Sequence, residues 1–119
     1  MTDTRRYTID PPPSANKLWK IRDGRMVKTD EYKSWKIAAS WSIKSQRQGE
    51  ALDGPTAVTL SLKRPRKNAD IDNRIKPVLD ALEAGGAIVN DKQVTAVCAA
   101  WAMHEGCQIT VSPDVGAAV

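Results

Sequence analysis

Three aspartates and one lysine in the second half of the chain have the residue types of a metal-assisted site. Asp70 and Asp72 are two residues apart, so in an extended segment their carboxylates point to the same side and can share a cation. Lys76 follows one helical turn after Asp72 and returns to the same neighbourhood. Carboxylate oxygens without a sulfur or histidine ligand select a hard ion. The spacing therefore predicts a site for Mg²⁺, or for Mn²⁺ in its place.

Asp91 is the candidate for a third metal ligand. It follows Asn90 at the expected turn between a helix and the next strand. A helix of about thirteen residues would carry the chain about 20 Å away from Asp72. Asp91 can therefore join the site only if the chain doubles back after Gly85-Gly86, and spacing alone does not establish that return.

A basic run lies directly before these acids. Residues 63–67 read Lys-Arg-Pro-Arg-Lys. Positive side chains attract the phosphates of nucleic acids, and a bound metal can activate a phosphate for hydrolysis. The combination indicates that a phosphate is brought to a metal.

A purely structural interpretation of the same residues stays open. Asp70 or Asp72 would then cap the following helix, and Asp91 would form a turn. Lys76 would pair with Asp80, four residues further along a helix. On this interpretation the acids have no role in chemistry.

The charge is distributed unevenly along the chain. The 18 Lys and Arg exceed the 14 Asp and Glu by only four. Residues 1–76, however, hold 17 of the basic residues and nine of the acids, whereas residues 77–119 hold one basic residue and five acids. A basic surface built mainly by the first two-thirds of the chain makes nucleic acid the first candidate partner, and a solvated surface that only keeps the protein soluble is the alternative.

The elements that would position these residues follow from hydrophobic periodicity and capping signals. Strands alternate polar and apolar residues, and helices repeat apolar residues every three or four positions. Pro77 requires the second helix to start late or to kink near Asn73. The expected elements are a strand at residues 6–9, a basic hairpin around 23–24, a helix at 29–48, a strand at 58–62, a helix at 72–84, and a terminal hairpin of strands at 95–103 and 107–111.

This order predicts an α+β fold. It reads β-α-β-α-β-β, with two helices packed on a mixed or antiparallel sheet. With 119 residues, the chain suits one domain over 1–119 that needs no disulfide or structural metal. Cys98 and Cys107 fit neither a disulfide framework nor a zinc site and are expected to be small core residues. No signal sequence or membrane span is evident, so the expected location is the cytoplasm, in association with DNA.

The acidic segment resembles the signature of the RusA-type Holliday junction resolvases, which are small endodeoxyribonucleases common in phages and prophages. Pro12-Pro13-Ser14-x-Asn16, after the first strand, resembles the N-terminal element of that family, and the order of elements agrees with it. The resemblance therefore covers nearly the whole chain. The central motif reads Asp70-x-Asp72-Asn73-x-x-Lys76-x-x-x-Asp80-Ala81-Leu82, followed by Asn90-Asp91-x-Gln93-Val94.

The resemblance implies a dimeric, Mg²⁺-dependent nuclease. Asp70, Asp72 and Asp91 match the metal-binding acids of the family, and Lys76 matches its catalytic lysine. It also implies that the chain folds back to bring Asp91 to the site. Family members often carry two consecutive acids where this chain has Asn90-Asp91, so a supporting role of residue 90 is in question. Pro77 has no obvious counterpart in the motif.

The function that follows is resolution of a four-way DNA junction in recombination or repair, by hydrolysis of one phosphodiester bond in each of two opposed strands. The expected enzyme is a homodimer and needs no nucleotide cofactor. Two alternatives remain: a nuclease without junction selectivity, and a non-catalytic DNA-binding regulatory module. Basic side chains near the acids are expected to bind DNA phosphates. These are Lys63, Arg64, Arg66, Lys67 and Arg74, with Lys17, Arg25 and Lys92 as weaker candidates.

Overall fold

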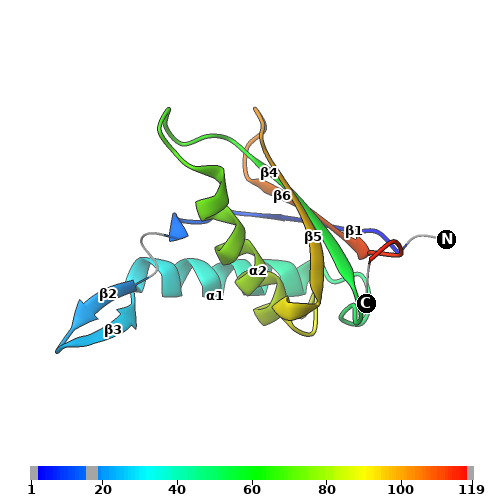
Figure 1. Cartoon of the computed structure of the whole chain (residues 1–119), viewed down its shortest axis with the longest axis horizontal. Coiled ribbons are helices and arrows are strands. Elements are labelled where there is room, and N and C mark those ends of the chain that lie inside the picture. Colours follow the sequence, from blue (N-terminus) through cyan, green and yellow to red (C-terminus); the bar gives the residue numbers. More distant parts are fainter. Residues whose placement is uncertain (1–2, 16–18, 118–119) are drawn as a thin grey trace.

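The chain folds into a four-stranded sheet with two helices against one of its faces, and a separate two-stranded hairpin (Figure 1). The computed structural model describes residues 3–15 and 19–117. The predicted α+β class is confirmed. The elements are β1 (Arg5–Ile9), β2 (Trp19–Arg22), β3 (Arg25–Lys28), α1 (Asp30–Ser45), β4 (Thr56–Leu62), the 3₁₀ helix η2 (Ile71–Arg74), α2 (Ile75–Ala84), the 3₁₀ helix η3 (Asp91–Gln93), β5 (Val94–Trp101) and β6 (Cys107–Pro113).

The main sheet is mixed, with the strand order β1-β6-β4-β5. β4 and β5 are parallel, whereas β6 runs antiparallel to both β1 and β4. β2 and β3 pair with each other around the predicted turn, where Asp23 and Gly24 both have positive φ. The expected basic hairpin is therefore confirmed.

The prediction that the last two strands form a hairpin is wrong. β4 lies between them, because Leu62 is opposite Cys107 of β6 on one side and opposite Trp101 of β5 on the other. A parallel neighbour of β4 must be reached by a crossover, and α2 supplies it. The chain then crosses the end of β4 to reach β6, and the Ala102 amide donates to the Leu62 carbonyl at 2.8 Å.

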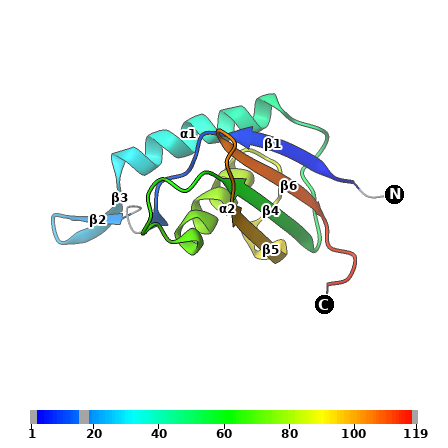
Figure 2. The same ribbon diagram turned by 90° about the horizontal axis from the view of Figure 1, so that it is seen from above.

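The core lies between the helices and the inner face of the sheet, and no helix of the described residues covers the outer face (Figures 1 and 2). Alternate residues of β4 and β6 point inward, so each strand buries every second side chain. No helix in the described part of the chain is long and apolar enough to span a membrane. The core side chains with no more than 1% exposure include Val58, Leu60, Leu62, Ile109, Val111, Ile43, Val78 and Leu82.

Both helices begin for reasons that are visible in the sequence. The Thr29 hydroxyl caps α1 by accepting the Tyr32 amide at 3.2 Å, and α1 ends at Ser45, slightly before the predicted end. Pro77 is the third residue of α2. A first-turn amide has no intrahelical partner to lose, so proline is tolerated there. The late start that Pro77 predicts is confirmed, with η2 filling the preceding turn.

The two cysteines differ in environment. Cys107 is fully buried, as predicted, and burial raises the pKa of its thiol to about 12. Cys98 is exposed on β5, so the prediction that it lies in the core is wrong. The cause is the face on which it lies, because Cys98 is opposite the likewise exposed Thr59 of β4, on the side of the sheet away from the helices. Both thiols are free.

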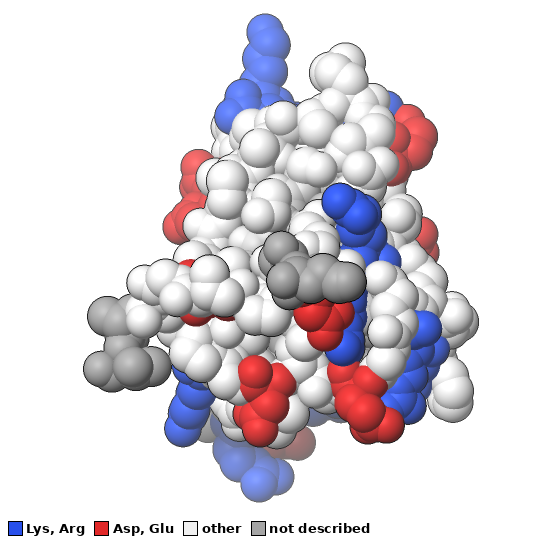
Figure 3. All heavy atoms as spheres, turned by 90° about the vertical axis from the view of Figure 1, so that its right-hand side faces the viewer, with Lys and Arg blue, Asp and Glu red and all other residues white. Residues whose placement is uncertain are grey.

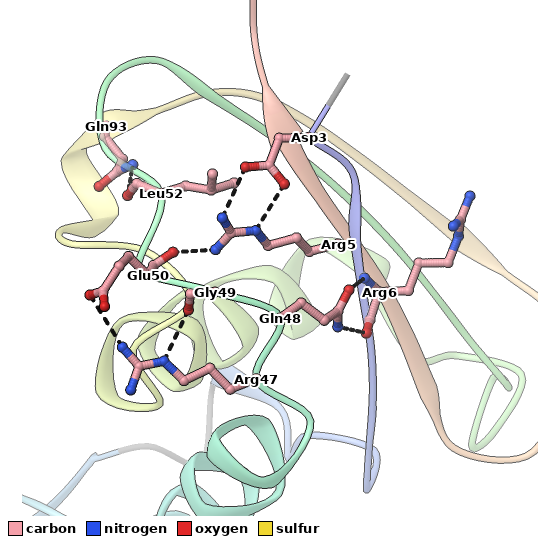
Figure 4. Close-up of polar contacts among 9 residues, drawn as sticks. All are labelled: Asp3, Arg5, Arg6, Arg47, Gln48, Gly49, Glu50, Leu52 and Gln93. Atoms are coloured by element: carbon pink, nitrogen blue, oxygen red, sulfur yellow. Dashed lines mark hydrogen bonds and ion pairs between the residues drawn. The ribbon is translucent and has the colours of Figure 1, made fainter. Parts of the chain in front are cut away.

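The outer edge of β1 is covered by two glutamine side chains from the end of α1 and the following loop. The Gln48 amide donates to the Arg6 carbonyl at 2.6 Å and accepts the Arg6 amide at 3.1 Å (Figure 4). Gln46 does the same at Thr8, at 2.7 and 2.8 Å. These bonds satisfy backbone groups that an edge strand otherwise leaves open to pairing with another chain.

Arg5 fixes the start of β1 to the loop after α1. This buried guanidinium donates to both carboxylate oxygens of Asp3, at 3.1 and 2.9 Å, and also to the Glu50 carbonyl (Figure 4). Two parallel bonds from one guanidinium to one carboxylate are a strong charge-assisted arrangement. A buried positive charge is thus matched by a negative one.

Replacement of Gly85 by alanine tests the contact between α1 and α2. A Cβ atom at Gly85 would lie 2.7 Å from Cβ and 2.8 Å from Cγ2 of Ile43. Overpacking of this kind costs about 1–3 kcal/mol, so Gly85→Ala should lower the free energy of unfolding in urea by that amount. Gly116→Ala is the control, since its Cβ would meet no atom within 4 Å. Equal stability of both variants would contradict the proposed packing.

Candidate active site

Lys76 lies at the centre of a cluster of charged side chains on α2 and η3. Its ammonium nitrogen is 2.6 Å from Oδ2 of Asp91 and 3.0 Å from Oδ1 of Asp80. The Lys76–Asp80 pair is the helical contact that the structural interpretation predicted. The Lys76–Asp91 pair joins residues fifteen apart in the sequence. The lysine side chain is 55% exposed, so the cluster opens to solvent.

The chain reverses after α2 and brings Asp91 back to Lys76. Gly86 has a φ of +80°, which permits the turn. The returning segment is then held by Leu52, whose amide donates to the Ala87 carbonyl at 3.0 Å and whose carbonyl accepts the Val89 amide at 3.3 Å. The doubling back that Asp91 requires is therefore present.

η3 holds Asp91 through its neighbours. The Asn90 side chain caps this turn by accepting the Lys92 amide at 2.8 Å. Asn90, which stands where family members often carry a second acid, therefore has a structural contact. The Gln93 carboxamide accepts the Asn90 amide at 2.9 Å. The same carboxamide donates to the Leu52 carbonyl at 2.8 Å (Figure 4). The backbone of the turn is thus tied to the loop before β4.

Glu83 of α2 completes these contacts. Its carboxylate accepts the Asp91 amide at 2.7 Å. Lys76, Asp80 and Glu83 lie three or four residues apart and so share one face of α2. The face of the helix that carries Lys76 therefore also fixes the backbone of η3.

Asp80 is held from the opposite side by a buried tyrosine. The Tyr32 hydroxyl donates to Oδ2 of Asp80 at 2.6 Å, while Oδ1 of Asp80 accepts from Lys76. Tyr32 on α1 is fully buried. Burial, followed by the bond to Asp80, raises the pKa of this phenol well above its usual value, so it remains a donor. A chain of contacts thus leads from α1 to the exposed lysine.

The ion pairs shift the pKa values of both partners at Lys76. The hydrogen bonds that Lys76 donates to Asp91 and Asp80 raise the pKa of Lys76, and Lys76 lowers the pKa of Asp91. The stabilisation at Asp91 is therefore present at neutral pH and is lost as the pH falls through its lowered pKa. The stabilisation at Lys76 is lost as the pH rises through its raised pKa. Both effects are modest because the pair is partly exposed.

Asp70 and Asp72 lie apart from these ion pairs. Asp70 occupies the N-cap position of η2, as the structural interpretation predicted, but its side chain forms no capping hydrogen bond. Asp72 is inside η2, and residues 70–72 are therefore not the extended segment that the shared-cation argument assumed. Both residues are exposed. Within residues 3–15 and 19–117, no three His, Cys, Asp or Glu side chains are grouped to hold a metal.

The basic residues predicted to bind DNA have different surroundings. Lys63 pairs with Glu105, and the Arg64 guanidinium lies 5.2 Å from the centre of the Trp101 ring. Arg74 is buried and donates to the Pro12 carbonyl at 2.7 Å. Lys17 lies outside the described residues. Side chains that are exposed and unpaired within the described part of the chain are Arg25, Arg66, Lys67 and Lys92.

A second basic surface, which the sequence analysis missed, lies along α1. A groove of about 450 Å³ is lined by the ring of Tyr32, the largely exposed Trp41 and four lysines. Within the described residues these lysines form no ion pair with an acid. Three of these lysines recur along one helix, and this spacing is the sequence signal that could have indicated a phosphate-binding surface. They are Lys28, Lys33, Lys36 and Lys44.

The comparisons with known proteins agree on one family. Residues 8–112 match the family model described as endodeoxyribonuclease RusA. A protein of Aquifex aeolicus (strain VF5), named crossover junction endodeoxyribonuclease RusA, is 32% identical over 88 residues, which cover 73% of this chain and 70% of that protein. Residues 8–112, which match the family model, contain the whole cluster around Lys76.

The pKa of Lys76 tests the arrangement directly. Asp80→Asn removes one of the two anions beside the ammonium group, so the Lys76 pKa should fall, as measured by NMR titration of its side-chain carbon signals. Glu83→Gln is the matched control, because Glu83 contacts the Asp91 amide and not Lys76. An unchanged Lys76 pKa in Asp80→Asn, or an equal fall in both variants, would contradict the described ion pairs.

Proposed function

Because the chain belongs to the RusA family of endodeoxyribonucleases, and is accordingly a hydrolase that cleaves DNA, we propose that it resolves four-way DNA junctions by paired, Mg²⁺-dependent phosphodiester hydrolysis. The whole chain, residues 1–119, would form the catalytic domain and act on cytoplasmic DNA in recombination or repair. The observation that carries the proposal is the exposed Lys76, held between Asp80 and Asp91 within the family-matching segment.

The proposed metal ligands are Asp70, Asp72 and Asp91. Their donor atoms are all carboxylate oxygens, which suit Mg²⁺, or Mn²⁺ in its place. When bound, such an ion supplies charge stabilisation to the scissile phosphate and lowers the pKa of the attacking water. Asp91 is engaged by Lys76, so this role requires that ion pair to open.

Lys76 would then bind the scissile phosphate. Its ammonium group is exposed and already positioned by Asp80, which accepts at the same time from Tyr32. A fixed positive charge beside a phosphate offsets the negative charge that develops in the transition state. Tyr32 and Asp80 are positioning residues in this proposal, because they act through Lys76.

The DNA contacts are proposed to come from the basic side chains around the acids. Lys63, Arg64, Arg66 and Lys67 precede η2, and Lys92 is next to Asp91. The lysines along α1 extend the positive surface on the other side of Tyr32. Phosphate contacts of this kind position a duplex without reading its sequence.

We further propose a homodimer that pairs through the outer face of the sheet. By register, Cys98, Thr59 and Thr110 share this face, and all its described residues except Arg6 are uncharged. Figure 3 shows a broad area free of charged side chains in the upper part of that view. A second copy of a basic protein meets the least repulsion where like charges are absent, and a two-fold dimer would present two sites to two strands.

Replacement of Asp72 tests the catalytic proposal. Asp72→Asn removes a ligand charge, so cleavage of a four-way junction with Mg²⁺ should fall at least about a hundredfold, since the metal contributes several kcal/mol to the transition state. Junction binding in gel-shift assays should persist. Asp53→Asn, on an exposed loop outside the cluster, should cleave normally. Cleavage by Asp72→Asn at the normal rate would refute the assignment.

The same assay separates the alternatives. Equal cleavage of a junction and of a linear duplex of the same sequence would identify a nuclease without junction selectivity. Junction binding by the unaltered protein without cleavage under any divalent ion would instead identify a binding module. Either outcome would overturn the proposed activity.

The dimer is tested by sedimentation. Thr59→Lys places a charge in the middle of the largely uncharged outer face and should convert a dimer into a monomer. Ser34→Lys, at an exposed position of α1, should leave the dimer intact. A dimer that is unaffected by Thr59→Lys would place the interface elsewhere, and a monomeric unaltered protein would reject the homodimer.

A further inference from the structure

A small pocket next to η2 is lined by two arginines that form no ion pair with an acid of the described residues. It has a volume of about 260 Å³ and lies between the proline segment after β1, the N-terminal turn of α1 and the loop before η2. This is smaller than the roughly 300 Å³ at which typical small-molecule sites begin. The lining residues are Pro13, Ser14, Glu31, Pro65, Arg66 and Arg74.

Arg74 is a buried cation whose hydrogen-bonding capacity is only partly used. It is 9% exposed, its Nη1 atom donates to the Pro12 carbonyl at 2.7 Å, and its Nε atom has no partner within the described residues. A buried donor without a partner is unfavourable by about 1–3 kcal/mol, and more when it is charged. Such groups in native proteins usually have a ligand, a water or a functional role.

The contrast with Arg5 shows that this arrangement is specific. Arg5 is buried to a similar degree, at 8% exposure, but its guanidinium binds both oxygens of Asp3. At Arg74 no carboxylate of the described residues forms an ion pair, and Arg66 lines the same pocket. Arginine remains charged in proteins, so two like charges face one pocket. The missing component is an anion.

We propose that this pocket binds one phosphate group of the DNA backbone, next to the phosphate that is cleaved. A guanidinium presents its donors as a planar fork that matches two oxygens of a phosphate. Arg74 supplies the fixed fork, and Arg66 supplies a second, exposed charge from the loop. Because Arg74 is two residues from Asp72, a phosphate held here would place its neighbour at the acids. This inference rests on the proposed function for the identity of its ligand.

The proline segment has a specific part in this site. Pro12 has a fixed φ and no amide proton, so its carbonyl is presented on a rigid backbone. That carbonyl accepts a hydrogen bond from Nη1 and so fixes one end of the Arg74 guanidinium beside the pocket. Glu31 is exposed at the rim and forms no ion pair with either arginine within the described residues. Its negative charge should weaken phosphate binding.

Inorganic phosphate tests the pocket on the full chain without DNA. Isothermal titration at constant ionic strength, with chloride as the comparison anion, should reveal saturable binding of one phosphate per chain. Arg66→Ala should weaken this binding roughly tenfold, as expected for loss of a hydrogen bond between charged groups. Glu31→Gln should strengthen it severalfold. Arg22→Ala is the matched control, because this exposed arginine on β2 is outside the pocket.

The outcomes separate this inference from the proposed function. Absence of saturable binding, or equal weakening by Arg66→Ala and Arg22→Ala, would overturn the pocket even if the protein cleaves junctions. Binding with the expected variant pattern supports the pocket, and in a protein that cleaves no DNA it would leave the anion site standing while the proposed function fails. Glu31→Gln keeps the test independent of folding, since it predicts a gain in affinity.

Discussion

The parallel pairing of β4 and β5 is the constraint on which the candidate site depends. Parallel neighbours cannot be joined by a tight turn, so the chain must leave the end of β4, cross the inner face of the sheet as α2, and return to the start of β5. The departure produces the loop with the basic run and η2. The return produces η3. Asp72 and Asp91 therefore lie at opposite ends of one crossover, and Lys76, near the start of α2, extends along the helix to the returning segment.

Burial is used differently at the two ends of the polar network around Lys76. Tyr32 is fully buried and therefore has one orientation, which it transmits to Asp80 through a single short hydrogen bond. Lys76 is largely exposed and is ordered by the two carboxylates instead of by packing. A lysine side chain held in this way keeps its charge accessible. The Tyr32 hydroxyl behind Asp80 fixes that carboxylate and so limits the positions that the Lys76 ammonium group can occupy.

Local features of the sequence predicted local structure well. Thr29 and Pro77 located the helix starts, and the four-residue spacing identified the Lys76–Asp80 pair. Long-range features escaped because no local signal carries them. The position of β4 between β5 and β6 depends on how the crossover packs, and the burial of Arg74 depends on Pro12, 62 residues away. The Tyr32–Asp80 bond likewise joins two helices whose contact the periodicity of each does not specify.

The same network explains why acids gather on a protein that is basic overall. Asp80 and Asp91 would repel each other across the space between α2 and η3 unless a positive charge lay between them. Lys76 supplies that charge from one turn before Asp80, so the two ion pairs are mutually dependent, and removal of either carboxylate changes the environment of the other. In the proposed site Asp80 keeps its bond from Tyr32 and its ion pair with Lys76, while Asp91 turns to the metal. The acidic residues thus hold a positive charge in place among lysines and arginines that attract phosphate.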